Sequence, residues 1–146
     1  MDYSVLVIHL LGAAVWTGGH LVLALTVLPR ALRLRDPEIL REFEQGFERI
    51  GIPALLVQVA SGVWLAWRYS PDPIAWITLA DPVSAGIGLK LGLLVLTALF
   101  AVNARFRVIP QLSAETLPLM ALHIRAVTLF SVLFVATGAY LSRGGF

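Results

Sequence analysis

The sequence contains no cysteine. This absence excludes disulfide bonds, thiolate metal ligands and covalent haem attachment through a Cys-x-x-Cys-His motif. Any bound metal ion must therefore be held by imidazole, carboxylate, thioether or backbone groups, and any haem must be held non-covalently. The chain also lacks a P-loop, a dinucleotide-binding fingerprint and a recognisable Ser/His/Asp catalytic set.

Charged side chains are scarce, at 14% of 146 residues against about 25% in a typical soluble domain, while 58% are apolar. Four apolar runs have the length of about 20 residues that a membrane-spanning helix needs, namely 4–28, 50–68, 84–107 and 120–141. The N-terminus lacks the basic segment of a signal peptide, so we expect the first run to be retained. The sequence predicts an all-α integral membrane four-helix bundle, a single transmembrane domain over residues 1–146 with the lipid bilayer as its partner.

The basic residues are distributed unevenly between the predicted connections. Eight of the eleven lie on one side, in the first and third connections: Arg30, Arg33, Arg35, Arg41, Arg49, Arg105, Arg107 and Arg125. By the positive-inside rule those connections face the cytoplasm and both termini lie outside, which indicates a multi-pass protein of a bacterial-type inner (cytoplasmic) membrane. The first connection also carries five acidic residues, which favours a solvated, salt-bridged helix over a nucleic-acid-binding patch.

The second half of the chain resembles the first. The segments Ala60–Leu65 and Ala136–Leu141 match at an offset of 76 positions. Shorter matches connect the first and third runs: Leu11-Gly12 with Leu91-Gly92, and Leu28-Pro29 with Ile109-Pro110. Chance similarity between membrane helices is one explanation. The other is duplication, which predicts two parallel repeats of a helix hairpin around an axis along the membrane normal.

The histidines are not repeated. In the repeat alignment, His20 matches Phe100 and His123 matches Phe47. A duplicated scaffold that later became asymmetric fits a site built from a few specific side chains.

His9 and His20 lie in the first apolar run, and His123 lies at the start of the last. Ionisable side chains at membrane depth are costly and mark candidate functional sites. Helix geometry puts His9 and His20 on one face, about 20° apart in angle and about 16 Å apart along the axis. His20 and His123 lie about 25 and 27 Å from the outer ends of their helices, so the two share one level.

Two imidazoles that face each other at one level have the geometry of a b-type haem site, and they serve equally as part of a copper site. The structural alternative is that His20 is a buried neutral histidine bonded to a neighbour and that His123 is an interfacial histidine. We favour His20 and His123 as the ligand pair, and we expect His9 to form a second or auxiliary site.

Four further residues are candidates for cofactor binding. Lys90, near the level of His9, either extends outward to the membrane surface or approaches the His9 site or a haem propionate. Asn103, deep in the same helix, can bond a ligand or a neighbouring backbone group. Arg49 and Arg125 lie at the cytoplasmic end, where they either set the topology or hold haem propionates.

The chain resembles two families of membrane proteins. The residues Phe47, Ser61-Gly62, Gly86 to Lys90, Asn103 and Pro110, preceded by His9 and Trp16-Thr17-Gly18-Gly19, resemble the copper-resistance CopD domain. The residues His9, Leu28-Pro29-Arg30 and Lys90 resemble the HemJ-like protoporphyrinogen oxidases, which are small four-helix membrane proteins. The first resemblance implies copper handling and the second implies bound haem b.

The favoured interpretation is a membrane metalloprotein that binds haem b, copper or both through His9, His20 and His123. It would carry out electron transfer or a small redox reaction, with a redox partner protein; whether it is an enzyme is left open. One alternative is a copper transport or resistance protein in which His9 and His20 line a path across the bilayer. Another is a non-catalytic membrane subunit. Gly88-x-x-x-Gly92 and Gly18-Gly19 permit the close helix approach of a homo-oligomer.

Overall fold

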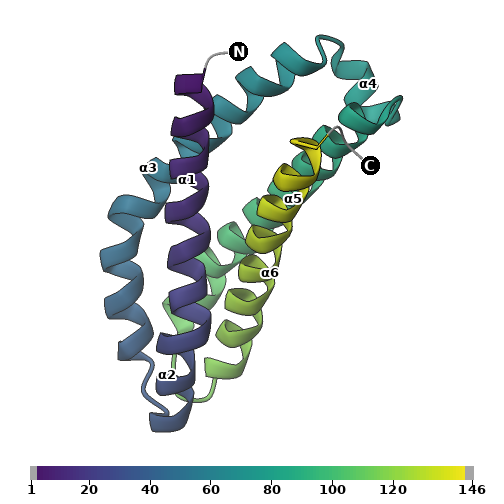
Figure 1. Ribbon diagram of the computed structural model, residues 1–146. Helices are drawn as coiled ribbons and strands as arrows, with labels where there is room; N and C mark the ends of the chain where they lie inside the picture. Colours follow the sequence, from purple (N-terminus) through teal and green to yellow (C-terminus); the bar gives the residue numbers. More distant parts are fainter. Residues whose placement is uncertain (1–2, 144–146) are drawn as a thin grey trace.

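The computed structural model describes residues 3–143, and Figure 1 shows them as a bundle of long helices. The helical segments in this range are α1 (Tyr3–Val22), η1 (Leu23–Val27), α2 (Leu28–Leu34), α3 (Glu38–Tyr69), α4 (Pro73–Thr78), α5 (Pro82–Asn103), η2 (Ala104–Val108), η3 (Ile109–Gln111) and α6 (Leu117–Leu141). They join into four continuous rods long and apolar enough to cross a membrane: Tyr3–Leu34, Glu38–Tyr69, Pro82–Gln111 and Leu117–Leu141. The predicted all-α four-helix membrane bundle is therefore confirmed.

The second rod is much longer than its predicted span of 50–68. Helix α3 begins at Glu38, so the charged first connection forms the start of this helix. The link that precedes it is short: Arg35 adopts a left-handed conformation with φ of 53°, and the Asp36 N–H donates to the Ala31 carbonyl. Pro53 lies inside α3 without ending it, as membrane helices tolerate.

The four rods form two antiparallel hairpins. Helix α1 packs along α3, and α5 packs along α6. The hairpins are joined through α1 and α6, while α3 and α5 share no comparable interface in the described part of the chain. Helix α6 is the most enclosed span, with 39% of its apolar window buried against 17–22% in the other three. Residues on the inner face of α6, which packs against both α5 and α1, are therefore well shielded from the surroundings.

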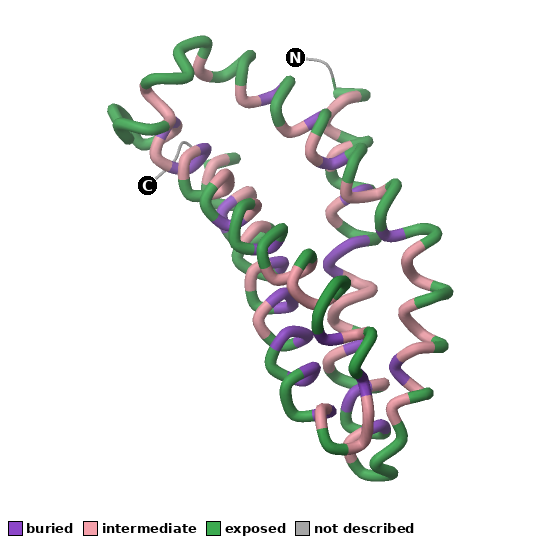
Figure 2. The backbone as a smooth tube through the Cα atoms, turned by 180° about the vertical axis from the view of Figure 1, so that it is seen from behind, coloured by how far each residue is buried: buried purple, intermediate pink, exposed green. Residues whose placement is uncertain are grey.

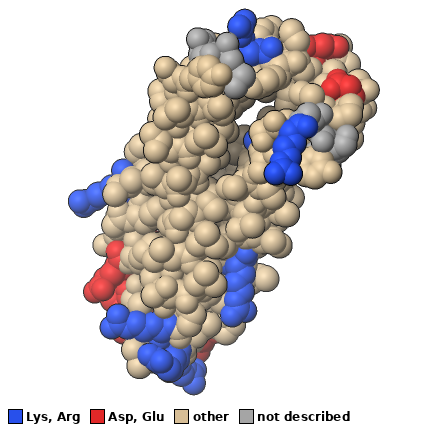
Figure 3. Space-filling model, viewed as in Figure 1, with Lys and Arg blue, Asp and Glu red and all other residues tan. Residues whose placement is uncertain are grey.

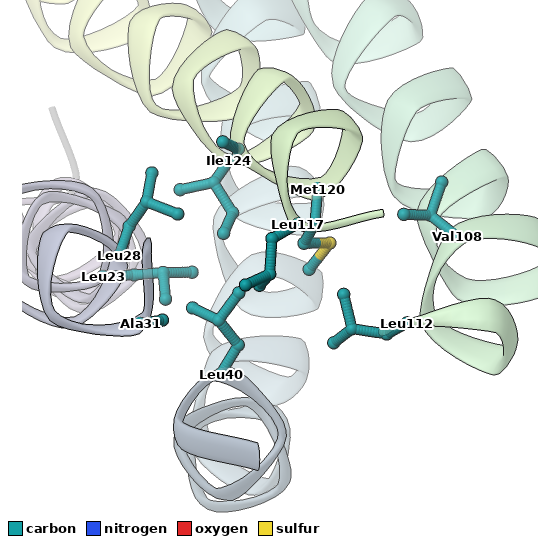
Figure 4. Packing of buried hydrophobic residues seen from close by; sticks show 10 residues of the cluster. Leu23, Leu28, Ala31, Leu40, Val108, Leu112, Leu117, Met120 and Ile124 are labelled. Carbon is teal, nitrogen blue, oxygen red and sulfur yellow. The ribbon is translucent and has the colours of Figure 1, made fainter. Parts of the chain in front are cut away.

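Most fully buried apolar side chains gather at one end of the bundle, beside the links between α2 and α3 and between η3 and α6 (Figure 4). Leu28, Leu40, Leu117 and Met120 are almost completely enclosed there. Arg41, near the start of α3, connects the two links, because its Nη2 donates to the carbonyl of Leu112, which follows η3, at 2.6 Å. Elsewhere the buried positions follow the inner faces of the helices (Figure 2), and exposed large apolar side chains are left to contact lipid.

The termini of the described chain lie at the opposite end from this core. The start of α1 and the end of α6 are both at the top of Figure 1. Several basic side chains, all arginines at this end, lie around the core end on the face that Figure 3 shows. This arrangement is the charge asymmetry on which the predicted topology depends.

An irregular feature of the first hairpin recurs in the second. The π-helical segments η1 and η2 are each followed directly by a dipeptide that ends in proline, Leu28-Pro29 or Ile109-Pro110. In both, the N–H of the residue before proline donates to the carbonyl five residues back. Proline has no N–H of its own to continue the ladder, and such a bulge accommodates the interruption. The recurrence of this irregularity supports duplication over chance similarity.

Candidate functional site

His20 and His123 line the same small cavity. Its volume is about 70 Å³, and it lies where α1 meets α6, with α3 and the end of α5 completing the wall. The lining residues are Trp16, His20, Leu23, Glu44, Ala101, Ala104, Met120, His123, Ile124 and Val127. The structure thus brings together the two imidazoles that the sequence paired by depth, although they come from the first and last helices.

The His20 ring is held by its own helix and by its neighbours. Its Nδ1 donates to the Trp16 carbonyl at 2.9 Å, which leaves Nε2 without a hydrogen-bond partner among the described residues. The rings of Trp16 and Phe47 lie 4.4 and 5.5 Å from it, centroid to centroid. The Thr128 hydroxyl donates to the His20 carbonyl at 3.2 Å, which connects α6 to α1 at this level. His20 therefore presents a free nitrogen from a fixed position.

Both nitrogens of His123 are engaged. Its Nδ1 donates to the Leu119 carbonyl at 2.9 Å, and its Nε2 lies 3.0 Å from the side-chain oxygen Oδ1 of Asn103. The sequence left Asn103 to bond a ligand or a backbone group, whereas in the structure its partner is a histidine side chain. The two imidazoles thus share a cavity but differ in availability.

Each hairpin contains one histidine packed against one phenylalanine, but the helix that carries the histidine differs between the two hairpins. His20 contacts Phe47 at 5.5 Å, and Phe100 contacts His123 at 5.3 Å. Because His20 aligns with Phe100 and Phe47 aligns with His123, each pair is the repeat equivalent of the other, with the imidazole and the benzene ring exchanged. The site is therefore built at equivalent places in the two hairpins from different side chains.

His9 lies elsewhere, against α3. Its Nδ1 lies 2.9 Å from the Gln58 carbonyl and 3.0 Å from Ser61 Oγ. The Gly62 Cα gives the ring room, since a Cβ there would come within 3.0 Å of His9 Cε1. His9 does not line the cavity of His20 and His123, so any role for it belongs to a separate place on the same helix.

Lys90 turns toward α6. A Cβ at Gly138 would lie 3.1 Å from Lys90 Nζ, so the amine lies over this glycine. Gly138 is the repeat equivalent of Gly62, which His9 covers. His9 and Lys90 therefore occupy nearly equivalent places in the two hairpins.

Arg49 and Arg125 are exposed and do not line the cavity. Nothing in their placement draws them toward His20 or His123, so the predicted role of holding propionates at this site receives no support. Among the neighbouring arginines, Arg105 forms an ion pair with Glu48 at 2.9 Å.

Two cavity residues were missed in the sequence, Glu44 and Met120. Glu44 was assigned to a solvated connection, but it lies three residues before Phe47 on α3 and hence on the same helix face. Met120 lies three residues before His123 on α6 and is almost fully buried. Both could have been found from the sequence, because each lies three residues, or about one helical turn, before a residue already selected, Phe47 or His123.

The cavity does not fit haem b. Pockets for larger organic ligands occupy about 300–1,000 Å³, and this one has about 70 Å³. Such a space accommodates an ion or a few water molecules. Imidazole and thioether donors both suit copper. Between residues 3 and 143, no group of three or more His, Asp or Glu side chains is arranged to hold a metal ion. A bound ion would therefore depend on the two histidines together with the Met120 thioether.

Comparison with known families gives a match over most of the chain. The sequence model of the family described as copper resistance protein D matches residues 41–141. This range contains α5, α6 and most of α3, and therefore His123, Asn103, Glu44 and Met120. No curated protein and no solved structure matches the chain.

Proposed function

Since this chain belongs to the copper resistance protein D family, we propose that it carries copper ions across the membrane and that the His20–His123 cavity is its inner binding site. The copper ion is the cargo. It enters from the outer side, where both termini lie, and leaves toward the cytoplasm across a bacterial-type inner membrane. The arginines around the core end of the bundle support this orientation.

One observation carries the proposal: His20, His123 and Met120 line one cavity of about 70 Å³ where α1 meets α6, the most enclosed of the four spans. Imidazole is a good copper ligand, and a thioether adds preference for Cu(I) over harder ions. His20 offers a free Nε2, and Met120 and His123 line the same cavity from α6. Glu44 adds a carboxylate from α3 that can attract a cation or accept a proton.

His9 supplies a second, outer copper-binding site on the same path. It lies about 16 Å farther out on α1, on the same helix face as His20. Its Nδ1 is oriented by Gln58 and Ser61, which leaves Nε2 without a partner among the described residues. Lys90, in the nearly equivalent place of the second hairpin, limits how strongly a cation is retained there by charge repulsion.

Copper binding and uptake test the proposal together. Purified protein in detergent is titrated with Cu(I) against a chromophoric chelator, and proteoliposomes are assayed for radioactive copper uptake. We expect His20→Ala, His123→Ala and Met120→Leu each to weaken Cu(I) binding and slow uptake. Gln111→Ala, at an exposed position, is the matched control and retains both. Unchanged binding and uptake in both histidine variants would contradict the proposal.

An optical spectrum separates copper transport from the haem-based redox function that the sequence also predicted. The size of the cavity favours a colourless Cu(I)-loaded protein. A Soret band with stoichiometric haem would show that a porphyrin binds somewhere on this chain, and transport of the bare ion through this cavity would then have to be abandoned.

A further inference from the structure

Asn103 occupies the one nitrogen of His123 through which the ring could bind an ion. Nδ1 faces the Leu119 carbonyl of its own helix, and Nε2 lies 3.0 Å from the Asn103 side-chain amide. The atom that faces Nε2 is Oδ1 of Asn103, so Nε2 carries a proton and donates to it; if the amide is turned over, Nε2 of the neutral ring accepts from the amide N–H instead. In both cases the lone pair on Nε2 is not available to copper.

We infer that Asn103 is a gate on the inner copper site, an inference that rests on the proposed function. The Asn103–His123 hydrogen bond and coordination of copper by His123 exclude each other. His20, whose Nε2 is free, is then the first ligand that an arriving ion meets. His123 joins only after the Asn103 amide turns away, and return of the amide helps to release the ion.

The surroundings of Asn103 allow this turn. Asn103 is the last residue of α5 and directly precedes the π-helical segment η2. Bulges of this kind loosen the regular ladder and occur often at functional sites. The cavity-lining residues on this rod are its neighbours in sequence, Ala101 and Ala104, whose small side chains limit the obstruction to a turn of the amide.

The gate belongs to one hairpin alone. The repeat equivalents of Asn103 are Val22 or Leu23, depending on which side of the π-helical segment sets the register, and both are apolar. His20 therefore has no amide partner of this kind. The duplicated scaffold thus carries one open imidazole and one gated imidazole, which suits an ion that must both bind and leave.

Cu(I) affinity of the full-length protein in detergent tests the gate. Asn103→Leu keeps the size of the side chain and removes its hydrogen-bonding groups, so copper no longer competes with the amide. Because a typical hydrogen bond contributes a free energy equivalent to about a fivefold change in affinity, we expect Cu(I) to bind about fivefold more tightly. Gln111→Leu, which removes an exposed amide elsewhere, is the matched control and leaves the affinity unchanged. Damage to the fold would weaken binding, so a gain in affinity is a result that a purely structural role does not produce.

The double variant Asn103→Leu with His123→Ala assigns the gain to His123, because the effect of Asn103→Leu should vanish there. Unchanged or weaker binding by Asn103→Leu, in protein that loses affinity on His123→Ala, would overturn the gate and leave the proposed function standing. Unchanged binding by His123→Ala itself would instead remove the proposed function.

A second measurement uses the wild-type chain and does not depend on a variant that folds. In ¹⁵N-histidine NMR, we expect Cu(I) loading to shift His123 Nε2 while Nδ1 keeps its proton and its bond to Leu119. A spectrum in which His123 Nε2 does not change on loading, while His20 Nε2 does, would also overturn the gate.

Discussion

The two hairpins share a plan but differ in how they meet and in what they carry. Both run through a π-helical segment into a proline, and both place an imidazole against a phenylalanine. The interface between α1 and α6 is nevertheless close, whereas its repeat equivalent between α5 and α3 has no comparable contact. Repetition therefore supplies the scaffold, and the departures from it make the site.

A small number of side chains explains this asymmetry. Thr128 of α6 donates its hydroxyl to the His20 carbonyl on α1, and Thr17 of α1 reaches the Ser131 carbonyl at 3.5 Å. The repeat equivalent of Thr128 is Ile52, which lacks a hydroxyl, and that of Thr17 is Thr97, whose hydroxyl donates within its own helix to the Leu93 carbonyl. Inter-helix hydrogen bonds help to hold membrane helices together. The α1–α6 interface has this bond, and the α3–α5 side does not.

Of the changes considered, we expect replacing a site residue by its repeat equivalent to have the largest effect, which is on Cu(I) affinity. His20→Phe puts into the first hairpin the ring that the second carries as Phe100. We expect Cu(I) affinity to fall by at least about 10–100-fold, because that range already applies to loss of groups that only support a metal ligand. The reciprocal change, Phe100→His, adds an imidazole beside His123 and should not weaken binding. Chelator competition measures both, and equal losses in the two variants would refute the assigned asymmetry.

The matched glycines of the two hairpins provide the next test. A Cβ at Gly12 would meet the Ala54 carbonyl oxygen at 2.9 Å, whereas nothing lies within 4 Å of one at Gly92. We expect Gly12→Leu to reduce the free energy of unfolding by about 1–3 kcal/mol, as overpacking usually does. Gly92→Leu should change it by less than about 0.5 kcal/mol. Unfolding in mixed micelles with increasing SDS compares them, and similar losses would show that both glycines are at close contacts.

Two buried threonines of α6 test the bond between hairpins. The Thr128 hydroxyl is shared between the Ile124 carbonyl of its own helix at 2.7 Å and the His20 carbonyl of α1 at 3.2 Å, whereas the Thr137 hydroxyl donates only to Leu133 of its own helix. We expect Thr128→Val to lower the free energy of unfolding by about 0.6 kcal/mol, the average for such bonds in a membrane protein. Thr137→Val should have almost no effect. The same SDS titration applies, and a larger loss at Thr137 would contradict this account of the interface.

The smallest effect concerns pH, and we expect it at the start of α5 in the second hairpin. Asp81 caps α5 outside the membrane, and bonds from the Ser84 hydroxyl, then from the Ser84 and Val83 backbone N–H groups, lower the pKa of its carboxyl. A lowered pKa in the folded state means that stability is present above the ordinary carboxyl pKa and is lost as pH falls through the folded value.

The midpoint of SDS unfolding, measured from neutral to acidic pH, checks this linkage. Asp81→Asn should flatten the acidic part of the curve, and Ser84→Ala should shift it toward higher pH. A wild-type curve without any slope in the acidic range would contradict the role of this cap. Because Asp81 is fully exposed, solvent screens the interaction and the slope is shallow.

Much of this architecture was predictable from local sequence. Apolar run length gave the four spans, and helical rise put His20 and His123 at one level, where they do share a cavity. The family resemblance to CopD is confirmed by the match over residues 41–141. The redox partner, the homo-oligomer and the membrane orientation stay predictions.

Other features depended on packing that no local pattern expresses. Glu44 was assigned to a solvated connection because charge density describes composition, not which helix face is covered. The Asn103 amide was left without a defined partner, because the contact with His123 joins residues 20 positions apart across a helix connection. The exposure of Arg49 and Arg125 likewise depended on how each helix is rotated about its axis.

The sequence by itself determined that four apolar helices cross a bilayer in two similar hairpins, since hydrophobic run length and proline position act locally along the chain. Only the tertiary structure decided that α1 and α6 form the close interface, that its cavity is small, and that the Asn103 side chain occupies Nε2 of one of the two imidazoles. Rotation and separation of helices are set by a few side-chain contacts between distant segments, and these contacts exist only once the bundle has assembled.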